Sequence, residues 1–214
     1  MSILIAISGA TASGKSTFSR QLCELLQDNA PVLLNQDRYF RDFHEFSDEE
    51  ERAKRVTSNH PRAVLWEDLV SALENLKEGR AVTVPVSGTR ARQRGDEPME
   101  LGPSEVVIAE GHLLFNEARI IALADLTVFV DANVHERTVR RLLRDTESGK
   151  TTLQKATTWY RRDVIPNVAA YSEEKGKLAD VVIPFDRDNP LAVQVVADWV
   201  RMRVGRARPD GKYD

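Results

Sequence analysis

The sequence predicts an α/β fold, a parallel five-stranded sheet that helices cover on both faces. Short apolar runs rich in valine and isoleucine alternate along the chain with longer amphipathic segments. A glycine-rich motif joins the first apolar run to the first amphipathic segment. Such alternation is typical of β-α-β units, which place successive strands parallel in one sheet.

The apolar runs predict buried strands, because short continuous runs of this kind indicate strands that are covered on both faces. These strands are expected at residues 3–8, 32–35, 105–109, 126–130 and 181–184. Apolar residues at three- and four-residue spacing predict amphipathic helices between and after the strands. The helices are expected at residues 15–27, 66–76, 135–143 and 191–204.

Two stretches interrupt this alternation. Residues 81–101 hold a short apolar run, a polar basic turn through Gly95 and a second short run, which predicts a small β-hairpin outside the main sheet. Residues 42–51 are acidic, and a solvated helix face explains them better than a metal site. We expect one domain over residues 1–205 and a frayed polar tail over 206–214.

Composition limits the function classes. The chain has 214 residues, 42% of them hydrophobic, which is enough for a sizeable core. Its 30 Lys and Arg against 33 Asp and Glu give a net charge of -3, so no global field attracts nucleic acid or an anionic membrane. Cys23 is the only cysteine, which excludes an internal disulfide and favours a core residue in a reducing compartment. No secretory or membrane-spanning pattern is evident, and we expect a cytoplasmic location.

The glycine-rich motif is Gly9-Ala10-Thr11-Ala12-Ser13-Gly14-Lys15-Ser16, which fits the G-x-x-x-x-G-K-[ST] pattern of a P-loop. It follows a predicted strand and opens a predicted helix, so an ordinary glycine turn is the weaker alternative. Its backbone N–H groups and the helix N-terminus suit the phosphates of ATP, with Lys15 on the outer phosphates and the Ser16 hydroxyl on Mg²⁺. The predicted nucleotide-binding residues are Gly9, Thr11, Ala12, Ser13, Gly14, Lys15, Ser16 and Thr17. A GTP-driven switch needs an N-K-x-D motif, yet no asparagine is followed by lysine.

Carboxylates follow two of the predicted strands. Asp37 comes just after the second strand, and the carboxyl ends of parallel strands share one edge, so we expect Asp37 and Lys15 to face one crevice. There Asp37 can act as the catalytic base for an acceptor hydroxyl, the alternative being a cap of the next turn. Glu110 ends the third long strand, and its carboxylate is expected to face the Mg²⁺ at the P-loop, directly or through water. Tyr39 and Phe40 are candidate substrate-binding residues, with a core position as the even alternative.

The main basic concentration, residues 137–162, is predicted to form a lid over the phosphates. On a helix, Arg137, Arg141 and Arg144 share one face. Phosphoryl transfer gathers negative charge, and a closing arginine-bearing lid stabilises it, so Arg144 is a catalytic candidate together with Lys15 and Asp37. A solvated basic helix is the alternative.

At this point the chain resembles the uridine kinase family of P-loop kinases, whose relatives include nicotinamide riboside kinase and phosphoribulokinase. The shared motifs occur in family order over most of the chain. They are the P-loop, Gln36-Asp37 with two aromatics, His60-Pro61, Val84-Pro85-Val86, Glu110-Gly111-His112-Leu113, Arg140-Arg141-Leu142-Leu143-Arg144-Asp145 and Ala179-Asp180-Val181-Val182-Ile183-Pro184.

The resemblance implies roles for matching positions. Asp37 looks like the family's catalytic base, Glu110 like its magnesium-side carboxylate, Arg141 like its ribose-contacting arginine and Arg144 like a lid arginine near the phosphates. The family's ATP adenine lies near the loop after the last strand, here about residues 185–189. ATP and Mg²⁺ are the implied cofactors, and a homo-oligomer is possible because relatives often form one.

Departures from the family pattern leave the acceptor open. Ser58 and Asn59 stand where uridine kinases usually carry an aromatic residue and an aspartate before His-Pro. Ser87 and Arg92 stand where a tyrosine and a histidine read the pyrimidine, so Arg92 is a substrate-binding candidate. The lid is shorter between Asp145 and Lys150.

The expected function is ATP-dependent phosphorylation of the 5'-hydroxyl of a nucleoside. One alternative is a sugar-phosphate kinase, since Arg90, Arg92 and Arg94 could bind an acceptor's own phosphate. Another is a nicotinamide riboside kinase, because residues 110–116 resemble that kinase's version of the motif more than the version in uridine kinases. A nucleotide-binding regulator without catalysis is disfavoured, because it needs no base at Asp37.

Overall fold

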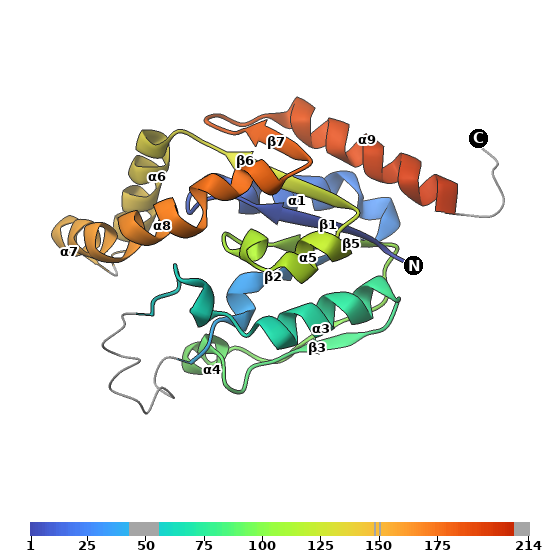
Figure 1. Ribbon diagram of the computed structural model, residues 1–214, viewed down its shortest axis with the longest axis horizontal. Helices are drawn as coiled ribbons and strands as arrows, with labels where there is room; N and C mark the ends of the chain where they lie inside the picture. The colour runs from blue at the N-terminus through green and yellow to red at the C-terminus, as the bar shows by residue number, and fades with distance from the viewer. Residues whose placement is uncertain (43–55, 148, 150, 208–214) are drawn as a thin grey trace.

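The computed structural model describes residues 1–42, 56–147, 149 and 151–207. Its centre is a five-stranded sheet with the strand order β2-β5-β1-β6-β7, and every neighbouring pair is parallel (Figure 1). This confirms the predicted parallel sheet. The strands are β1 Ile3–Ser8, β2 Val32–Asn35, β5 Val106–Glu110, β6 Leu126–Asp131 and β7 Val181–Pro184.

One face of the sheet packs against α1 (Lys15–Leu25) and α9 (Pro190–Ala207). Ile5 and Ile7 of β1 point to this face and are fully buried with Phe18 of α1. Alternate residues of a strand point to opposite faces, which is why a continuous apolar run suits a strand covered on both sides.

The other face packs against α3 (Trp66–Lys77) and α5 (Ala118–Leu123), and Figure 1 shows α3 and α9 on opposite sides of the sheet. Leu4 and Ala6 of β1 belong to this second core with Leu73 of α3. The helices on both faces that the sequence predicts are therefore present.

The first helix is shorter than predicted. It ends at Leu25, because the backbone N–H of Leu26 bonds the carbonyls of Leu22 and Cys23 and a 3-10 turn over Gln27–Asn29 follows. Cys23 is partly buried against the core, and burial raises the pKa of its thiol to about 11. A thiol that stays protonated is a poor nucleophile, in agreement with the predicted packing role.

The predicted hairpin forms a separate two-stranded antiparallel sheet of β3 (Val82–Val84) and β4 (Met99–Leu101). Between the strands the basic stretch is a short helix, α4 (Arg90–Arg94), where the sequence predicted only a turn. The Thr89 hydroxyl accepts a hydrogen bond from the Ala91 N–H, and Gly95 ends the helix with a φ of 71°. These two caps stabilise a helix too short for periodicity to reveal.

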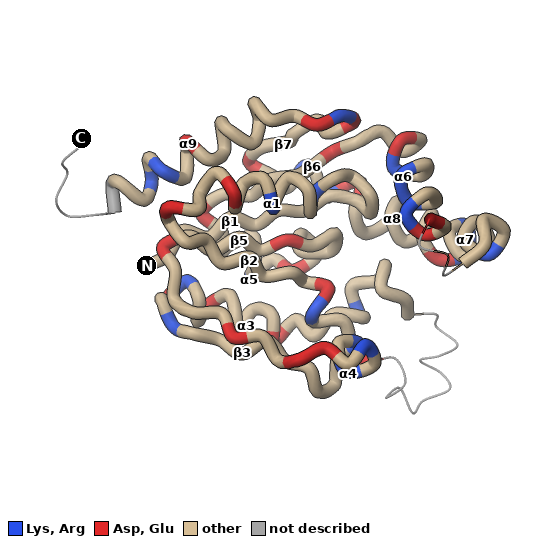
Figure 2. Tube along the Cα trace, turned by 180° about the vertical axis from the view of Figure 1, so that it is seen from behind, with Lys and Arg blue, Asp and Glu red and all other residues tan. Residues whose placement is uncertain are grey.

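A group of helices projects from one end of the sheet. It comprises α6 (Val134–Glu147), α7 (Leu153–Trp159), a π-helical turn (Tyr160–Val164) and α8 (Ile165–Tyr171). Figure 2 shows that Lys and Arg are concentrated on α6 and on α4. Both helices therefore bring positive charge to one end of the molecule.

Some predictions fall outside the described residues, namely the acidic stretch beyond residue 42 and the tail beyond residue 207. Within the described part of the chain, every helix is too short or too polar to cross a membrane.

Candidate active site

The P-loop joins β1 to α1 and needs glycine at two positions. A Cβ on Gly9 would lie 2.4 Å from the Val130 carbonyl oxygen. Gly14 has a φ of 97°, and a Cβ there would lie 2.4 Å from the ring of Phe185. Ala12 also has a positive φ, of 60°. Turns of this kind direct successive backbone N–H groups inward, which suits a bound phosphate.

Side chains of the P-loop contact α6. The Ser13 hydroxyl is buried and, within the described residues, has no hydrogen-bond partner. Thr11 is also buried, and its hydroxyl accepts a 2.6 Å hydrogen bond from Arg141 Nη1 of α6. Lys15, Ser16 and Thr17 form the first turn of α1. The predicted phosphate cradle thus has a fixed contact with the basic helix.

Glu110 ends β5 beside this cradle and is 2% exposed. Asn35 Nδ2 donates a 2.6 Å hydrogen bond to Glu110 Oε1, whereas Oε2 is buried and lacks a partner among the described residues. Burial raises the pKa of the Glu110 carboxyl, and the Lys15 charge and the Ser16 hydroxyl act in the opposite direction. The Glu110 carboxyl is therefore close to both P-loop groups.

This free carboxylate oxygen beside Ser16 fits the predicted magnesium role. The described residues contain no group of three or more His, Cys, Asp or Glu that could hold a metal on its own. Mg²⁺ is commonly bound by one or two protein oxygens, with water and substrate phosphates completing the shell. Ser16 and Glu110 are the residues that would hold it.

Asp37 lies in the 3-10 turn Gln36–Tyr39 directly after β2. Its side chain is 59% exposed, and its Oδ1 lies 4.0 Å from His112 Nδ1. In the sheet, Asn35 of β2 is paired in register with Glu110 of β5. Asp37 and Glu110 therefore stand at neighbouring strand ends.

His112 was not singled out by sequence reasoning, although it follows Glu110 by two positions. Its Nε2 lies 2.9 Å from the Ser58 carbonyl oxygen, which can only accept, so Nε2 carries a proton. Burial lowers the pKa of His112 to about 4. The ring is therefore neutral at physiological pH, and Nδ1 presents a lone pair towards Asp37.

The two aromatics after Asp37 are both buried in the core that contains α3, and they have different neighbours there. Tyr39 has no exposed surface and belongs to the core that contains α3, so the core alternative fits it better than a pocket wall. Burial raises the pKa of its phenol. Phe40 is 3% exposed, and its ring centroid lies 5.9 Å from the ring of His112. Phe40 thus packs against His112, the residue next to Asp37, where the acceptor is expected to bind.

On α4 the structure brings Arg90 to this side. Arg92 is exposed. The Arg90 guanidinium is half-buried, with Cζ 5.9 Å from the centroid of Phe40. Burial and the charge of Arg94 lower the pKa of Arg90, while Asp37 acts in the opposite direction because it is close. The sequence named Arg90 only together with Arg92 and Arg94, as residues that could bind an acceptor's own phosphate.

Arg141 and Arg144 of α6 line a cavity of about 330 Å³ between α6 and α7. Arg141 bonds Asp145 at 2.7 Å in addition to Thr11, and its Cζ lies 4.9 Å from the ring centroid of Trp159. Arg144 is 60% exposed, with Nε 3.4 Å from Asp145 Oδ1. Arg141 is thus held against the P-loop, whereas the Arg144 side chain faces solvent.

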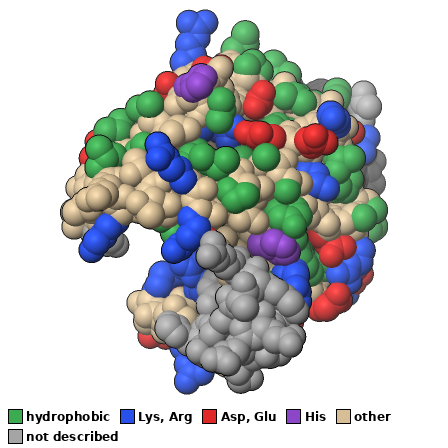
Figure 3. Space-filling view, turned by 60° about the vertical axis from the view of Figure 1, so that its left-hand side comes forward, with side chains coloured by type: hydrophobic (Ala, Val, Ile, Leu, Met, Phe, Trp, Pro, Cys, Tyr) green, Lys and Arg blue, Asp and Glu red, His purple; other side chains and the backbone are tan. Residues whose placement is uncertain are grey.

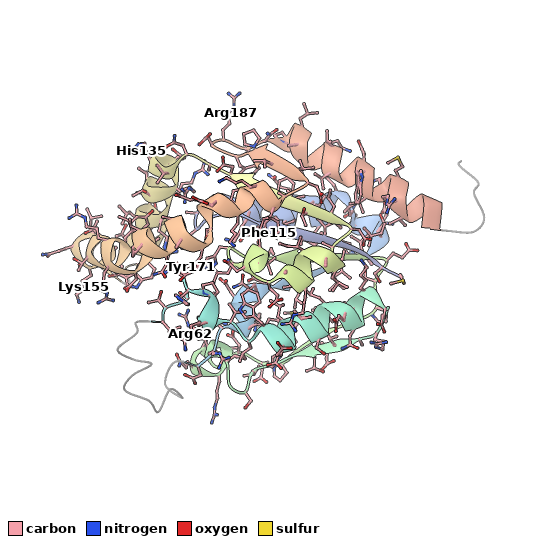
Figure 4. The ribbon with its side chains drawn as sticks, viewed as in Figure 1. Arg62, Phe115, His135, Lys155, Tyr171 and Arg187 are labelled. Carbon is pink, nitrogen blue, oxygen red and sulfur yellow. The ribbon has the colours of Figure 1, made fainter. Side chains whose placement is uncertain are left out.

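Positive charge follows the edge of the site. Figure 3 shows a hollow at one side of the molecule with several Lys and Arg side chains along its rim. Figure 4 shows Lys155 at the outer end of the projecting helices, and Lys155 also lines the cavity of Arg141 and Arg144. This field suits the phosphates of a nucleotide.

The loop after β7 forms a second cavity, of about 450 Å³, lined by Pro184 and residues 186–191. Arg140 of α6 donates hydrogen bonds to the carbonyls of Phe185 and Asp186. Gln21 of α1 donates one to Asp188 at 2.9 Å. The cavity coincides with the loop where the family resemblance places adenine.

The His60-Pro61 segment contacts the end of α8. Tyr171 lies next to the segment that carries Arg62 in Figure 4, and its hydroxyl is 3.0 Å from His60 Nε2. The rings of Tyr171 and His60 are 4.7 Å apart. This contact links α8 to the acceptor side without passing through the P-loop.

A parallel sheet with a P-loop after its central strand, a buried carboxylate beside that loop and basic helices next to it define a P-loop protein of the kinase type. The model of the phosphoribulokinase / uridine kinase family matches residues 4–192. The chain belongs to this family.

Curated relatives agree. A uridine kinase of Haemophilus influenzae is 36% identical over 200 residues, which cover 91% of this chain and 92% of that protein. A uridine kinase of Clostridium tetani is 32% identical over 207 residues, 96% of this chain and 97% of that protein. The chain spans only 42% of a chloroplastic uridine/cytidine kinase, UKL1, of Arabidopsis thaliana, to which it is 32% identical.

Solved structures share the fold. A putative fructose transport system kinase from Silicibacter sp. TM1040 superposes with a TM-score of 0.60 at 23% identity, covering 86% of this chain and 90% of that one. A possible uridine kinase from Bacillus stearothermophilus gives 0.51 at 19% identity, covering 85% and 88%. At these identities the likeness concerns the fold alone.

Proposed function

We propose that the protein is an ATP-dependent kinase that phosphorylates the 5'-hydroxyl of a nucleoside. The observation that carries the proposal is the placement of Asp37 and Glu110 at neighbouring strand ends beside the P-loop. A protein that only binds nucleotide has no use for an exposed carboxylate at Asp37. The names of the bacterial relatives support uridine or a similar nucleoside as the acceptor.

In the proposed reaction the P-loop and Lys15 hold the phosphates of ATP. The acceptor hydroxyl gives its proton to Asp37 as its oxygen bonds to the γ-phosphorus, and the bond from that phosphorus to the bridging oxygen breaks to release ADP. Mg²⁺, when bound, supplies positive charge to the phosphate oxygens. Arg141 fixes the lid to the loop, and Arg144 is free to turn inward from solvent when the lid closes.

The acceptor side favours a second candidate, an acceptor with an anionic or carbonyl-rich group. The half-buried Arg90 lies over Phe40 and close to Asp37, on the side where the acceptor would bind. A guanidinium only donates hydrogen bonds, so it selects phosphate, carboxylate or carbonyl oxygens. Ribulose 5-phosphate and nicotinamide riboside each present such oxygens.

We further propose a cytoplasmic enzyme that acts on small molecules with ATP and Mg²⁺. The single cysteine fits a reducing compartment. The near balance of charges offers no general attraction to nucleic acid. A homo-oligomer, as in many relatives, is compatible with this activity.

One assay tests the activity and its acceptor. The purified protein with Mg²⁺ and ATP is supplied with uridine, cytidine, nicotinamide riboside, ribulose 5-phosphate or pantothenate, and ADP release is recorded. We expect acceptor-dependent ADP release with at least one nucleoside. Release with ribulose 5-phosphate alone would favour the second candidate, and release with none of them would contradict the proposed function.

A further inference from the structure

Asn35 is the last residue of β2 and uses both ends of its amide. Its Nδ2 donates a 2.6 Å hydrogen bond to Glu110 Oε1. Its Oδ1 accepts a 2.7 Å hydrogen bond from the backbone N–H of Asp37 and so caps the turn that carries Asp37. One short side chain therefore touches the two carboxylate-bearing segments of the site.

The sheet explains why the contact is possible. Asn35 and Glu110 are register partners on adjacent parallel strands, so their side chains leave the sheet side by side. The neighbouring strand ends are fixed as well. Gln36 Oε1 accepts a hydrogen bond from the Leu113 N–H, and a Cβ on Gly111 would lie 2.4 Å from Gln36 Cβ. Asn35 thus acts within a closely packed frame.

The amide has the polarity that both partners require. A carboxylate oxygen only accepts and a backbone N–H only donates, which assigns Nδ2 to Glu110 and Oδ1 to Asp37. Serine would retain an oxygen for the cap, but its single hydroxyl is one atom closer to the backbone than the amide nitrogen that bonds Glu110 and replaces two polar atoms with one. Alanine would lose both contacts.

The contact also orients the Glu110 carboxylate. Oε1 is occupied by the amide, and Oε2 is the buried oxygen without a partner among the described residues. A donor on one oxygen favours the ionised carboxylate and turns the other oxygen to a fixed direction. Oε2 is the oxygen that Glu110 would offer to Mg²⁺.

We propose that Asn35 is a positioning residue that sets Glu110 for Mg²⁺ through its amide nitrogen and Asp37 for the acceptor through its amide oxygen. The inference rests on the proposed function for the role of Asp37. Asn35 touches neither nucleotide nor acceptor in this account. It acts through the two carboxylates.

The first test measures metal binding without turnover. Mn²⁺ is titrated into the enzyme with ADP, and free Mn²⁺ is followed by electron paramagnetic resonance. We expect Asn35→Ser to weaken Mn²⁺ binding about tenfold, the lower end of the range for partners that orient a metal ligand. Asn75→Ser is the control, because Asn75 lies on α3 and bonds Ser71 and Arg80 at the surface. Unchanged Mn²⁺ affinity in Asn35→Ser would overturn the Glu110 part of the proposal.

A double-mutant cycle distinguishes positioning from general damage. If Asn35 acts through Glu110, Asn35→Ser has little further effect on Mn²⁺ affinity in the Glu110→Gln background. Equal losses in both backgrounds would contradict the inference. Because the titration needs no acceptor, a protein that phosphorylates none of the tested compounds but shows this coupling would refute the proposed function and leave the metal contact standing.

The second test concerns the cap. At saturating Mg²⁺, Asn35→Ala should have a lower kcat than Asn35→Ser, by roughly fivefold, because only the serine variant keeps an oxygen for the Asp37 N–H, a contact of about 1 kcal/mol. Equal kcat values would overturn the Asp37 part. Asn35→Gly replaces Asn35→Ala in this comparison if the alanine variant does not fold. Glycine also lacks an oxygen for the Asp37 N–H, and it leaves room for a water molecule in place of the side chain.

Discussion

His112 is neutral beside Asp37, because burial lowers the pKa of its imidazole to about 4. The unprotonated Nδ1 of His112 lies 4.0 Å from Asp37 Oδ1. A neutral imidazole forms no ion pair, so His112 does not neutralise the Asp37 carboxylate. The carboxylate remains 59% exposed and available to an acceptor hydroxyl. This arrangement suits a base that must take one proton per turnover.

Replacing Asp37 by asparagine removes the charge and the basicity but keeps the shape. We expect kcat to fall on the order of a hundredfold, with ATP affinity little changed, because general-base contributions are usually of this size. Steady-state kinetics and calorimetric ATP binding measure the two quantities. A loss confined to ATP binding would assign Asp37 to the metal site instead.

Replacing Lys15 by alanine should abolish phosphoryl transfer and leave the fold intact. Lys15 begins α1 at the surface of the phosphate cradle and lies outside the hydrophobic core. Circular dichroism and thermal unfolding check the fold, and ADP release checks the activity. Turnover equal to that of the wild type would rule out the P-loop assignment.

At the scale of elements, the P-loop and the hairpin depend on close packing between segments far apart in sequence. Gly14 is the cap of α1 and lies against Phe185, which follows β7. The hairpin is joined to the turn after β2, since Arg90 N–H bonds the Phe40 carbonyl at 2.9 Å and Arg41 pairs with Thr89. Each contact brings one more group to the same edge of the sheet.

Gly14→Ala should be destabilising and should weaken ATP binding. The new Cβ would lie 2.4 Å from the Phe185 ring, and the φ of 97° disfavours any residue with a side chain. A loss of roughly 1–3 kcal/mol in the free energy of unfolding is expected from strain of this kind. Urea denaturation measures it. Gly102→Ala, where a Cβ meets nothing within 4 Å, is the matched control, and equal effects would contradict the packing account.

The hairpin gives a prediction about acceptor recognition. Arg90→Met should lower kcat/KM for the acceptor about tenfold, the value of one charged hydrogen bond, and Arg92→Met should change it less. KM for ATP should change little in both. A larger loss from Arg92→Met would restore the assignment that the sequence alone favours.

The sheet, its covering helices and the P-loop were predictable because they depend on local periodicity and on one motif. The position of Arg90 beside Phe40 was not, because α4 is a single short helix whose orientation depends on its contacts with Phe40 and Arg41. Asn35 was not singled out either, since its contact with Glu110 follows from the register of β2 against β5 and not from spacing along the chain. Tyr39 was left open because an aromatic after a strand suits both core and pocket.

At the scale of the whole molecule, the site forms where strand ends from both halves of the chain meet, so its groups are buried only in the folded state. His112 is neutral there, with a pKa of about 4 against an ordinary value of 6.5. In the unfolded chain the same imidazole takes a proton as the pH falls below 6.5. Acid therefore favours unfolding through this residue between pH 6.5 and about 4.

This linkage is testable by comparing the wild type with His112→Gln, which removes the titrating group. Between pH 7 and pH 4.5 the wild type should lose roughly 2 kcal/mol more free energy of unfolding than the variant. Urea denaturation at several pH values measures the difference. Parallel pH dependence in the two proteins would show that His112 is not held neutral by the fold.

The proposed activity is transfer of a phosphoryl group to a nucleoside by Asp37, Lys15 and the P-loop together. The most direct measurement is phosphorus NMR of the product made from uridine, Mg²⁺ and ATP by the wild type, Asp37→Asn and Lys15→Ala. The account predicts uridine 5'-phosphate from the wild type, about a hundredfold slower formation by Asp37→Asn and none by Lys15→Ala. A phosphate at another position of uridine, or equal rates in the wild type and Asp37→Asn, would contradict it.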